Sequence, residues 1–210
     1  MTMTLGDLLE MIRQDYIDHL TAMAEDLQAE GAEVMFEPAF RDDKGEVSLE
    51  GVLKLPARID LLAKRTVDGA ESVDPVQVAA EGVFKFDGSI DVAWENGMAV
   101  QVMPFGWDMM PLRMEGLGES ANYEPLQQWF WRWFAEPEGL EGPMQEVVHY
   151  LGDPEVKDGV TRVVADLGTA PLEAWQDLLD ACAACGATKV IIGEEATAED
   201  DDGDDAADDK

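Results

Sequence analysis

The segment IDVAWENGMAVQV, residues 90–102, decides the fold class, because apolar residues alternate with polar or small ones on both sides of an Asn-Gly pair. That pattern predicts two β-strands joined by a tight turn. A two-residue loop would pair Val92 with Gln101, whereas a three-residue loop pairs Val92 with Val100 and keeps one face apolar. The sequence therefore predicts a bulged hairpin with Gly97 in the left-handed conformation.

The two-residue period extends around this hairpin and predicts an antiparallel meander of about five or six strands over residues 33–114. Residues 47–55 alternate in the same way and are expected to form a strand after a turn at 42–45. Phe84 and Phe86 are expected to pair with the first strand of the hairpin.

Helical spacing of apolar residues flanks the predicted meander. Residues 5–30 carry an apolar stripe spaced by three and four, with Thr4 and Asp7 as a start signal and Gly31 as a C-terminal cap. A second helix, rich in aromatic residues, should begin near Pro125 and end before Pro137. A short apolar helix is expected at residues 144–151.

The last ordered part reads as a strand, a helix and a strand, at residues 160–167, 171–185 and 188–192. Thr169 is the expected N-cap of this helix, and Gly186 is expected to close it. The crossover rule predicts that the two strands are parallel neighbours if both join one sheet.

Together these elements predict an α+β fold with an N-terminal helix, an antiparallel β-meander, an aromatic helix and a C-terminal β-α-β unit. We expect a single domain over residues 1–192, in which a sub-boundary could fall near 116–124 or 136–143. Residues 193–210 are expected to be a disordered acidic tail, because they offer little apolar surface to offset the ordering entropy.

The chain is strongly acidic, with 46 Asp and Glu against 14 Lys and Arg and a net charge of −32. The tail carries ten acids and one lysine, so the first 192 residues retain a net charge of −23. A domain with this charge repels nucleic-acid backbones and anionic membranes and attracts basic proteins. We therefore expect no direct nucleic-acid or membrane binding, and a basic partner if there is a protein partner.

The N-terminal residues lack the basic and apolar regions of a secretory signal, and no stretch of about 18 apolar residues occurs. We expect a cytoplasmic protein with reduced thiols. Cys182 and Cys185 have the spacing of a redox pair, but they fall in the last turn of a predicted helix, where the dipole disfavours a thiolate. His19 and His149 are interpreted as isolated, so neither catalysis, a metal site nor a cofactor is expected.

The aromatic helix has more large side chains than one core layer can bury. One interpretation is that the C-terminal unit covers it, and the other is a homodimer seam or a partner groove, since Trp, Met and Arg favour interface centres. The partner-binding candidates are Trp129, Trp131, Arg132, Trp133, Met109 and Met110.

These observations favour a non-enzymatic, acidic protein-protein interaction module, such as an inhibitor, an immunity-type protein or an assembly factor that binds a basic partner. The alternative is a small-ligand-binding domain or an unrecognised enzyme whose acidity reflects salt adaptation or solubility. In that case the pocket candidates are Trp94, Met103 and Trp107.

Overall fold

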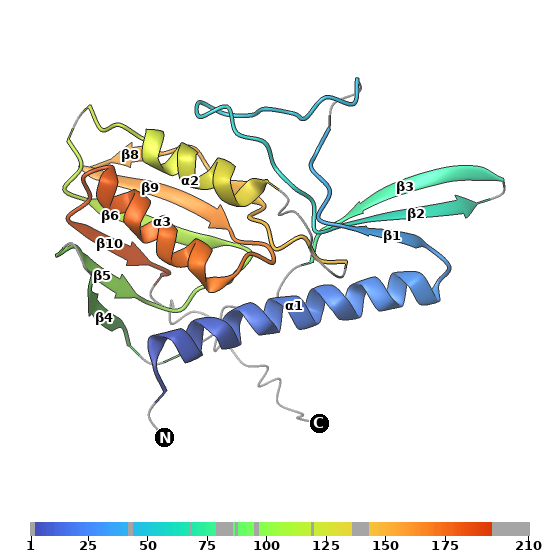
Figure 1. The fold of residues 1–210 in the computed structure, drawn as a ribbon, viewed down its shortest axis with the longest axis horizontal. Helices are drawn as coiled ribbons and strands as arrows, with labels where there is room; N and C mark the ends of the chain where they lie inside the picture. Colours follow the sequence, from blue (N-terminus) through green and yellow to red (C-terminus); the bar gives the residue numbers. More distant parts are fainter. Residues whose placement is uncertain are drawn as a thin grey trace, which may run out of the picture.

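The computed structural model describes residues 3–41, 44–67, 69–78, 86, 88–94, 97–118, 120–135 and 143–194. The fold class is α+β, as predicted (Figure 1). The helices of the described residues are α1 (Leu5–Ala29), α2 (Glu124–Phe134) and α3 (Leu172–Ala184). The strands are β1 (Glu33–Phe36), β2 (Leu61–Val67), β3 (Ala70–Val76), β4 (Ile90–Ala93), β5 (Ala99–Val102), β6 (Met110–Glu115), β7 (Tyr150–Leu151), β8 (Glu155–Lys157), β9 (Val160–Asp166) and β10 (Lys189–Ile192).

The strands form two sheets rather than one meander. The small sheet has the order β1-β2-β3, and the large sheet has the order β4-β5-β10-β6-β9-β7, with β8 paired to β9. The C-terminal strand β10 lies between β5 and β6, parallel to the first and antiparallel to the second. Its three consecutive buried residues, Val190, Ile191 and Ile192, suit this position, because a strand with neighbours on both sides buries more of its side chains than an edge strand does.

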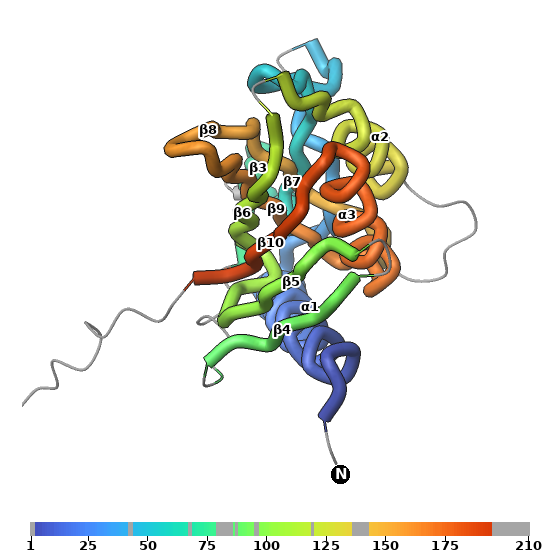
Figure 2. The backbone as a smooth tube through the Cα atoms, turned by 90° about the vertical axis from the view of Figure 1, so that its left-hand side faces the viewer, coloured from blue at the N-terminus to red at the C-terminus, as the bar shows by residue number. Residues whose placement is uncertain are grey.

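The three helices differ in which sheet they contact. Helices α2 and α3 lie side by side on the same side of the large sheet (Figures 1 and 2). Helix α1 contacts β1 and β2 of the small sheet and also α3. It therefore spans the junction between the two sheets, and its apolar stripe belongs to the same core cluster as the strands of both.

The hairpin that decides the fold class has the predicted register. Val92 pairs with Val100, and the backbone N–H of Trp94 donates to the carbonyl of Met98 at 2.8 Å. Gly97 has φ +86°, the left-handed conformation that the three-residue loop requires. Phe84 lies outside the described residues, so the pairing expected for it stays a prediction.

The limits of α1 follow its local signals. Thr4 and Asp7 form a reciprocal capping box, in which the Thr4 hydroxyl accepts the N–H of Asp7 and the Asp7 carboxylate accepts the N–H of Thr4. Gly31 follows the helix with φ +88°. The predicted boundaries of this helix are therefore confirmed to within one residue.

The strand predicted at residues 47–55 is wrong. Gly51 and Lys54 have φ +70° and +54°, so the chain turns there and makes only isolated bridges on either side. The carboxylate of Asp153, distant in sequence, accepts the backbone N–H groups of Val52 and Leu53 at 2.7 and 2.9 Å. A long-range partner thus takes the hydrogen bonds that a strand would have used.

The helix predicted at residues 144–151 is also wrong. Val147, Val148 and His149 are consecutive and all fully buried, which an amphipathic surface helix does not allow. The segment is extended instead, with the N–H of Val148 bonded to the carbonyl of Trp133 and that of His149 bonded to the carbonyl of Asp166.

Two details of the C-terminal unit need correction. Strands β9 and β10 have the same direction, but they are not neighbours, because β6 lies between them and is antiparallel to both. The N-cap of α3 is Pro171 and not Thr169. The hydroxyl of Thr169 donates to Glu37 instead. Gly186 follows α3 with φ +100°, as expected.

Substitutions at Thr4 test how much the capping box of α1 contributes to the stability of the fold. Replacing Thr4 by Ala removes the hydroxyl acceptor and should lower the free energy of unfolding by about 1 kcal/mol. Thr4→Ser keeps the hydroxyl and should stay close to wild type. Denaturant unfolding of both variants measures the difference, and equal values for Ala and Ser would contradict a stabilising role for the cap.

Candidate functional site

The outer face of α1 is rich in acidic residues. The helix carries six carboxylates and one arginine, and all six carboxylate residues are exposed. Its apolar stripe faces the sheets, so the acids occupy the opposite side over a length of about 37 Å. We call this surface the α1 acidic face and define it by Asp7, Glu10, Asp15, Asp18, Glu25 and Asp26.

The single arginine of α1 does little to neutralise this face. The Arg13 side chain is largely buried, and its guanidinium donates to the carbonyls of Ala170 and Thr169 at 2.8 and 2.9 Å. One remaining nitrogen lies 3.3 Å from Glu10. Arg13 thus fastens the loop before α3, and most carboxylates of the α1 acidic face have no cation beside them on the helix.

Helix α2 packs its aromatic residues mainly inward. Trp129, Phe130 and Phe134 are buried, and the indole N–H of Trp129 donates to the carbonyl of Ala174 in α3 at 2.8 Å. The half-buried Trp133 donates to Asp177 at 3.1 Å. The C-terminal unit therefore covers this helix, as the first interpretation of the aromatic segment expected.

The partner-binding candidates divide by exposure. Trp131 is 45% exposed and Met109 is 66% exposed, and Arg132 reaches solvent while it pairs with Asp177 at 2.9 Å. Trp129 and Met110 are buried in the core, so they are not placed to touch a partner directly.

The three residues predicted to line a pocket lie in the hydrophobic core or pack against it. Trp107 is buried and donates to the carbonyl of Gly168 at 2.9 Å, and Met103 is buried near it in sequence. Trp94 donates to Asp180 at 2.6 Å and contacts Trp175 edge-on.

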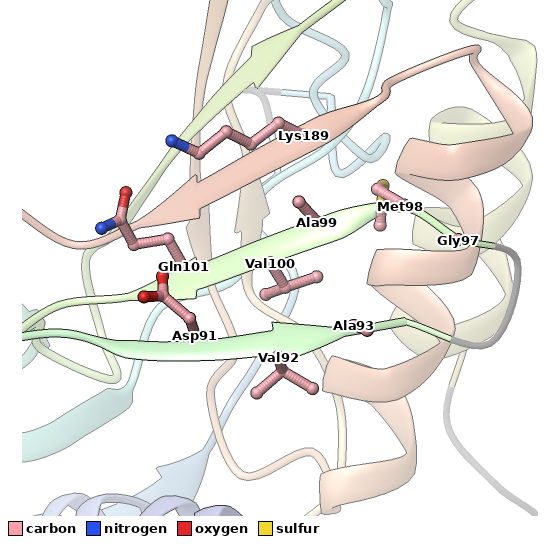
Figure 3. Close-up of a pocket in the computed structure, with 9 residues that line it drawn as sticks. All are labelled: Asp91, Val92, Ala93, Gly97, Met98, Ala99, Val100, Gln101 and Lys189. Atoms are coloured by element: carbon pink, nitrogen blue, oxygen red, sulfur yellow. The ribbon is translucent and has the colours of Figure 1, made fainter.

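Two concavities lie elsewhere on the surface. One, of about 330 Å³, lies over β4, β5 and β10, with Asp91, Gln101 and Lys189 projecting from the three strands (Figure 3). The other, of about 420 Å³, lies between α2 and α3 and includes Arg132 and Asp177. None of the three pocket candidates lines either concavity.

The positions of both cysteines disfavour the thiolate form. Cys182 is buried near the end of α3, Cys185 follows that helix, and both are free. Burial raises the pKa of both thiols, which disfavours the thiolate needed for redox chemistry. His19 lies on α1, where its Nδ1 donates to the carbonyl of Asp15 at 2.7 Å.

The second histidine is neither helical nor isolated, contrary to the sequence interpretation. His149 is fully buried, with its Nε2 at 2.8 Å from Oε1 of Glu37. Its Nδ1 lies 2.9 Å from Oδ1 of Asp60 and 3.6 Å from Oδ2 of Asp166. We call these four residues the His149 cluster.

The cluster joins all parts of the fold. Glu37 follows β1, Asp60 precedes β2, His149 precedes β7 and Asp166 ends β9, so both sheets contribute. From α1, the hydroxyl of Tyr16 donates to Asp60 at 2.8 Å.

The three carboxylates of the His149 cluster also accept hydrogen bonds from other groups. Glu37 accepts the hydroxyl and the N–H of Thr169 and the N–H of Gln145. Asp60 accepts the N–H of Val78 at 2.6 Å, and Asp166 accepts the N–H of Gly168 at 2.9 Å. The buried charges are therefore held by hydrogen bonds from separate segments, as buried carboxylates require.

The protonation of the cluster follows from opposing effects. Burial alone would lower the pKa of His149, but the negative charges of Asp166, Asp60 and Glu37 raise it well above its ordinary value. Burial raises the pKa of Asp166, whereas the contact with His149 outweighs burial and lowers the pKa of Glu37. Burial and the nearby carboxylates raise the pKa of Tyr16 well above its ordinary value.

Sequence reasoning missed this cluster because its members are far apart in the chain. The available signal was weak: Glu37, Asp60, His149 and Asp166 each stand at or next to the end of a short apolar run. A polar residue there is equally typical of a strand that ends at the surface. Only the fold shows that the four side chains meet.

Comparisons with known proteins assign no relative: no family model, no curated protein and no solved structure matches this chain. Among the described residues, no helix is both long enough and apolar enough to cross a membrane.

Gly168 tests the tight packing around His149. It has φ +51°, and an added Cβ would lie 2.4 Å from Cδ2 of His149 and 2.5 Å from the carbonyl oxygen of Val147. Gly168→Ala should therefore lower the free energy of unfolding by more than about 4 kcal/mol.

The matched control is Gly159→Ala, which has φ +78° but nothing within 4 Å of the added Cβ. It should cost only the backbone strain of about 1–2 kcal/mol. Urea unfolding compares the two variants, and equal losses would show that the packing against His149 is not tight.

Proposed function

We propose that the protein is a non-enzymatic, acidic binding module that docks a basic protein on the α1 acidic face. The observation that carries the proposal is the one-sided placement of six exposed carboxylates along a 25-residue helix whose only arginine bonds inward. A partner with lysines and arginines spaced along an elongated surface complements this face. The net charge of −32 also favours a positively charged partner.

The physical role of such a face is to steer and orient association. Carboxylates at the rim of an interface raise the rate of encounter with a basic partner and disfavour acidic ones. Exposed Met11 and Met23 on the same helix supply flexible apolar contact beside the charges. Both features suit an inhibitor, an immunity-type protein or an assembly factor.

The exposed residues at α2 provide a second contact region in this proposal. Trp131 is a large, half-exposed aromatic side chain, and Arg132 lies beside it in the sequence. Aromatic and arginine side chains supply much of the binding energy in protein interfaces. A partner that also covers this region would gain an anchor that charge alone does not give.

The test is quantitative affinity capture from native lysate at low salt and at about 0.15 M ionic strength, where long-range attraction is largely screened. The bait variant carries Asp15→Asn, Asp18→Asn and Glu25→Gln, which neutralise three carboxylates of the α1 acidic face. We expect a basic partner that wild type retains at the higher salt and that this variant binds about tenfold more weakly.

The matched control carries Glu71→Gln, Asp74→Asn and Glu155→Gln, three exposed acids on β3 and β8. It changes the net charge by the same amount and should retain the partner. Equal loss from both variants would indicate attraction to overall charge only, and no retained partner in wild type would contradict the proposal.

A further inference from the structure

We propose that Asp60, His149 and Asp166 form a buried site for one divalent transition-metal ion of the zinc type. One imidazole nitrogen and two carboxylate oxygens from these residues lie within 4.8 Å of one another. The three residues come from segments that meet only in the folded chain, so the site would form on folding. The inference is independent of the proposed function.

The strongest observation is the position of a potential ligand atom. Nδ1 of His149 is buried and has no hydrogen-bond partner among the described residues. Oδ1 of Asp60 is only 2.9 Å away, and Oδ2 of Asp166 is 3.6 Å away. A buried polar atom without a hydrogen bond is costly, and a shared cation would give Nδ1 and both oxygens a common partner.

The opposite side of the imidazole is arranged as in metal-binding histidines. Nε2 lies 2.8 Å from Oε1 of Glu37, which has no proton of its own to give when ionised. With a metal ion on Nδ1, the imidazole would be neutral and its single proton would be on Nε2, where it donates to Glu37. A carboxylate that accepts from the second nitrogen is the usual outer partner of a metal-bound histidine.

Hydrogen bonds also position the two aspartates. Asp60 accepts the hydroxyl of Tyr16 and the N–H of Val78, and Asp166 accepts the N–H of Gly168 through Oδ1. Asp166 therefore keeps Oδ2 directed to His149. Such bonds fix the orientation of ligating carboxylates and lower the entropy lost on metal binding.

The donor set selects the class of metal. One nitrogen with two oxygens suits zinc and related first-row ions, whereas calcium and magnesium prefer oxygen ligands alone. Tetrahedral coordination at about 2.0–2.1 Å places ligand atoms about 3.4 Å apart, so a modest rotation of the carboxylates would close the site.

The alternative to a metal ion is a proton on Nδ1, which would make His149 a cation paired with the carboxylates.

The experiment distinguishes these two states with the full-length chain, freed of metal by a chelator and dialysed into about 0.5 M salt. The high salt suppresses diffuse cation binding by the acidic surface. Zn²⁺ and, as a spectroscopic probe, Co²⁺ are then added separately.

We expect one Zn²⁺ per chain by elemental analysis and a rise in melting temperature of at least about 5 °C with Zn²⁺ in excess. Co²⁺ should give visible ligand-field absorption. Asp166→Asn and His149→Gln should each abolish the absorption and weaken Zn²⁺ binding at least a hundredfold. His19→Gln, which changes the partly exposed histidine of α1, is the matched control and should bind as wild type does.

No stoichiometric ion and no change in melting temperature in the wild-type chain would overturn the proposal. Binding that persists in Asp166→Asn and His149→Gln would overturn it as well, because the ion would then be elsewhere. If either variant fails to fold, the ¹⁵N shifts of His149 in the wild type decide. A change at Nδ1 on adding Zn²⁺ supports the site, and none refutes it.

Discussion

The fold depends on the buried contact of His149 with three carboxylates. Glu37 and Asp60 belong to the small-sheet side, Asp166 belongs to the large sheet, and Tyr16 of α1 bonds to Asp60. Charges buried together are costly to separate, since loss of one partner leaves the others uncompensated at a cost of about 3–5 kcal/mol. The cluster therefore fixes how the two sheets and α1 sit together, and a shifted arrangement would leave buried charges unpaired.

The chain uses scarce cations for structure and leaves its surface acidic. Only 14 lysines and arginines occur in the sequence, yet Arg13 bonds backbone carbonyls in front of α3, and buried Arg58 bonds the carbonyls of Glu37 and Phe134. These two arginines hold loops at the junction of the sheets. On α1, most carboxylates of the acidic face have no cation beside them on the helix, and this is the basis on which we propose a binding role for that face.

Local signals in the sequence predicted the parts of the fold that depend on neighbours in the chain. The register at Val92 and the limits of α1 follow from turn and cap chemistry within a few residues. The parts set by distant partners were not predictable: Asp153 turns the chain at Gly51, and β10 enters between β5 and β6. The His149 cluster was missed for the same reason, because none of its members is distinctive alone.

Native-state hydrogen exchange measures the central claim, that the His149 cluster makes the two sheets one cooperative unit. The amides of β2 and of β9, followed separately by mass spectrometry, report the free energy at which each sheet opens. The account predicts that the best-protected amides of both strands exchange through one opening with the same free energy. Exchange of β2 through a separate opening, several kcal/mol below that of β9, would contradict it.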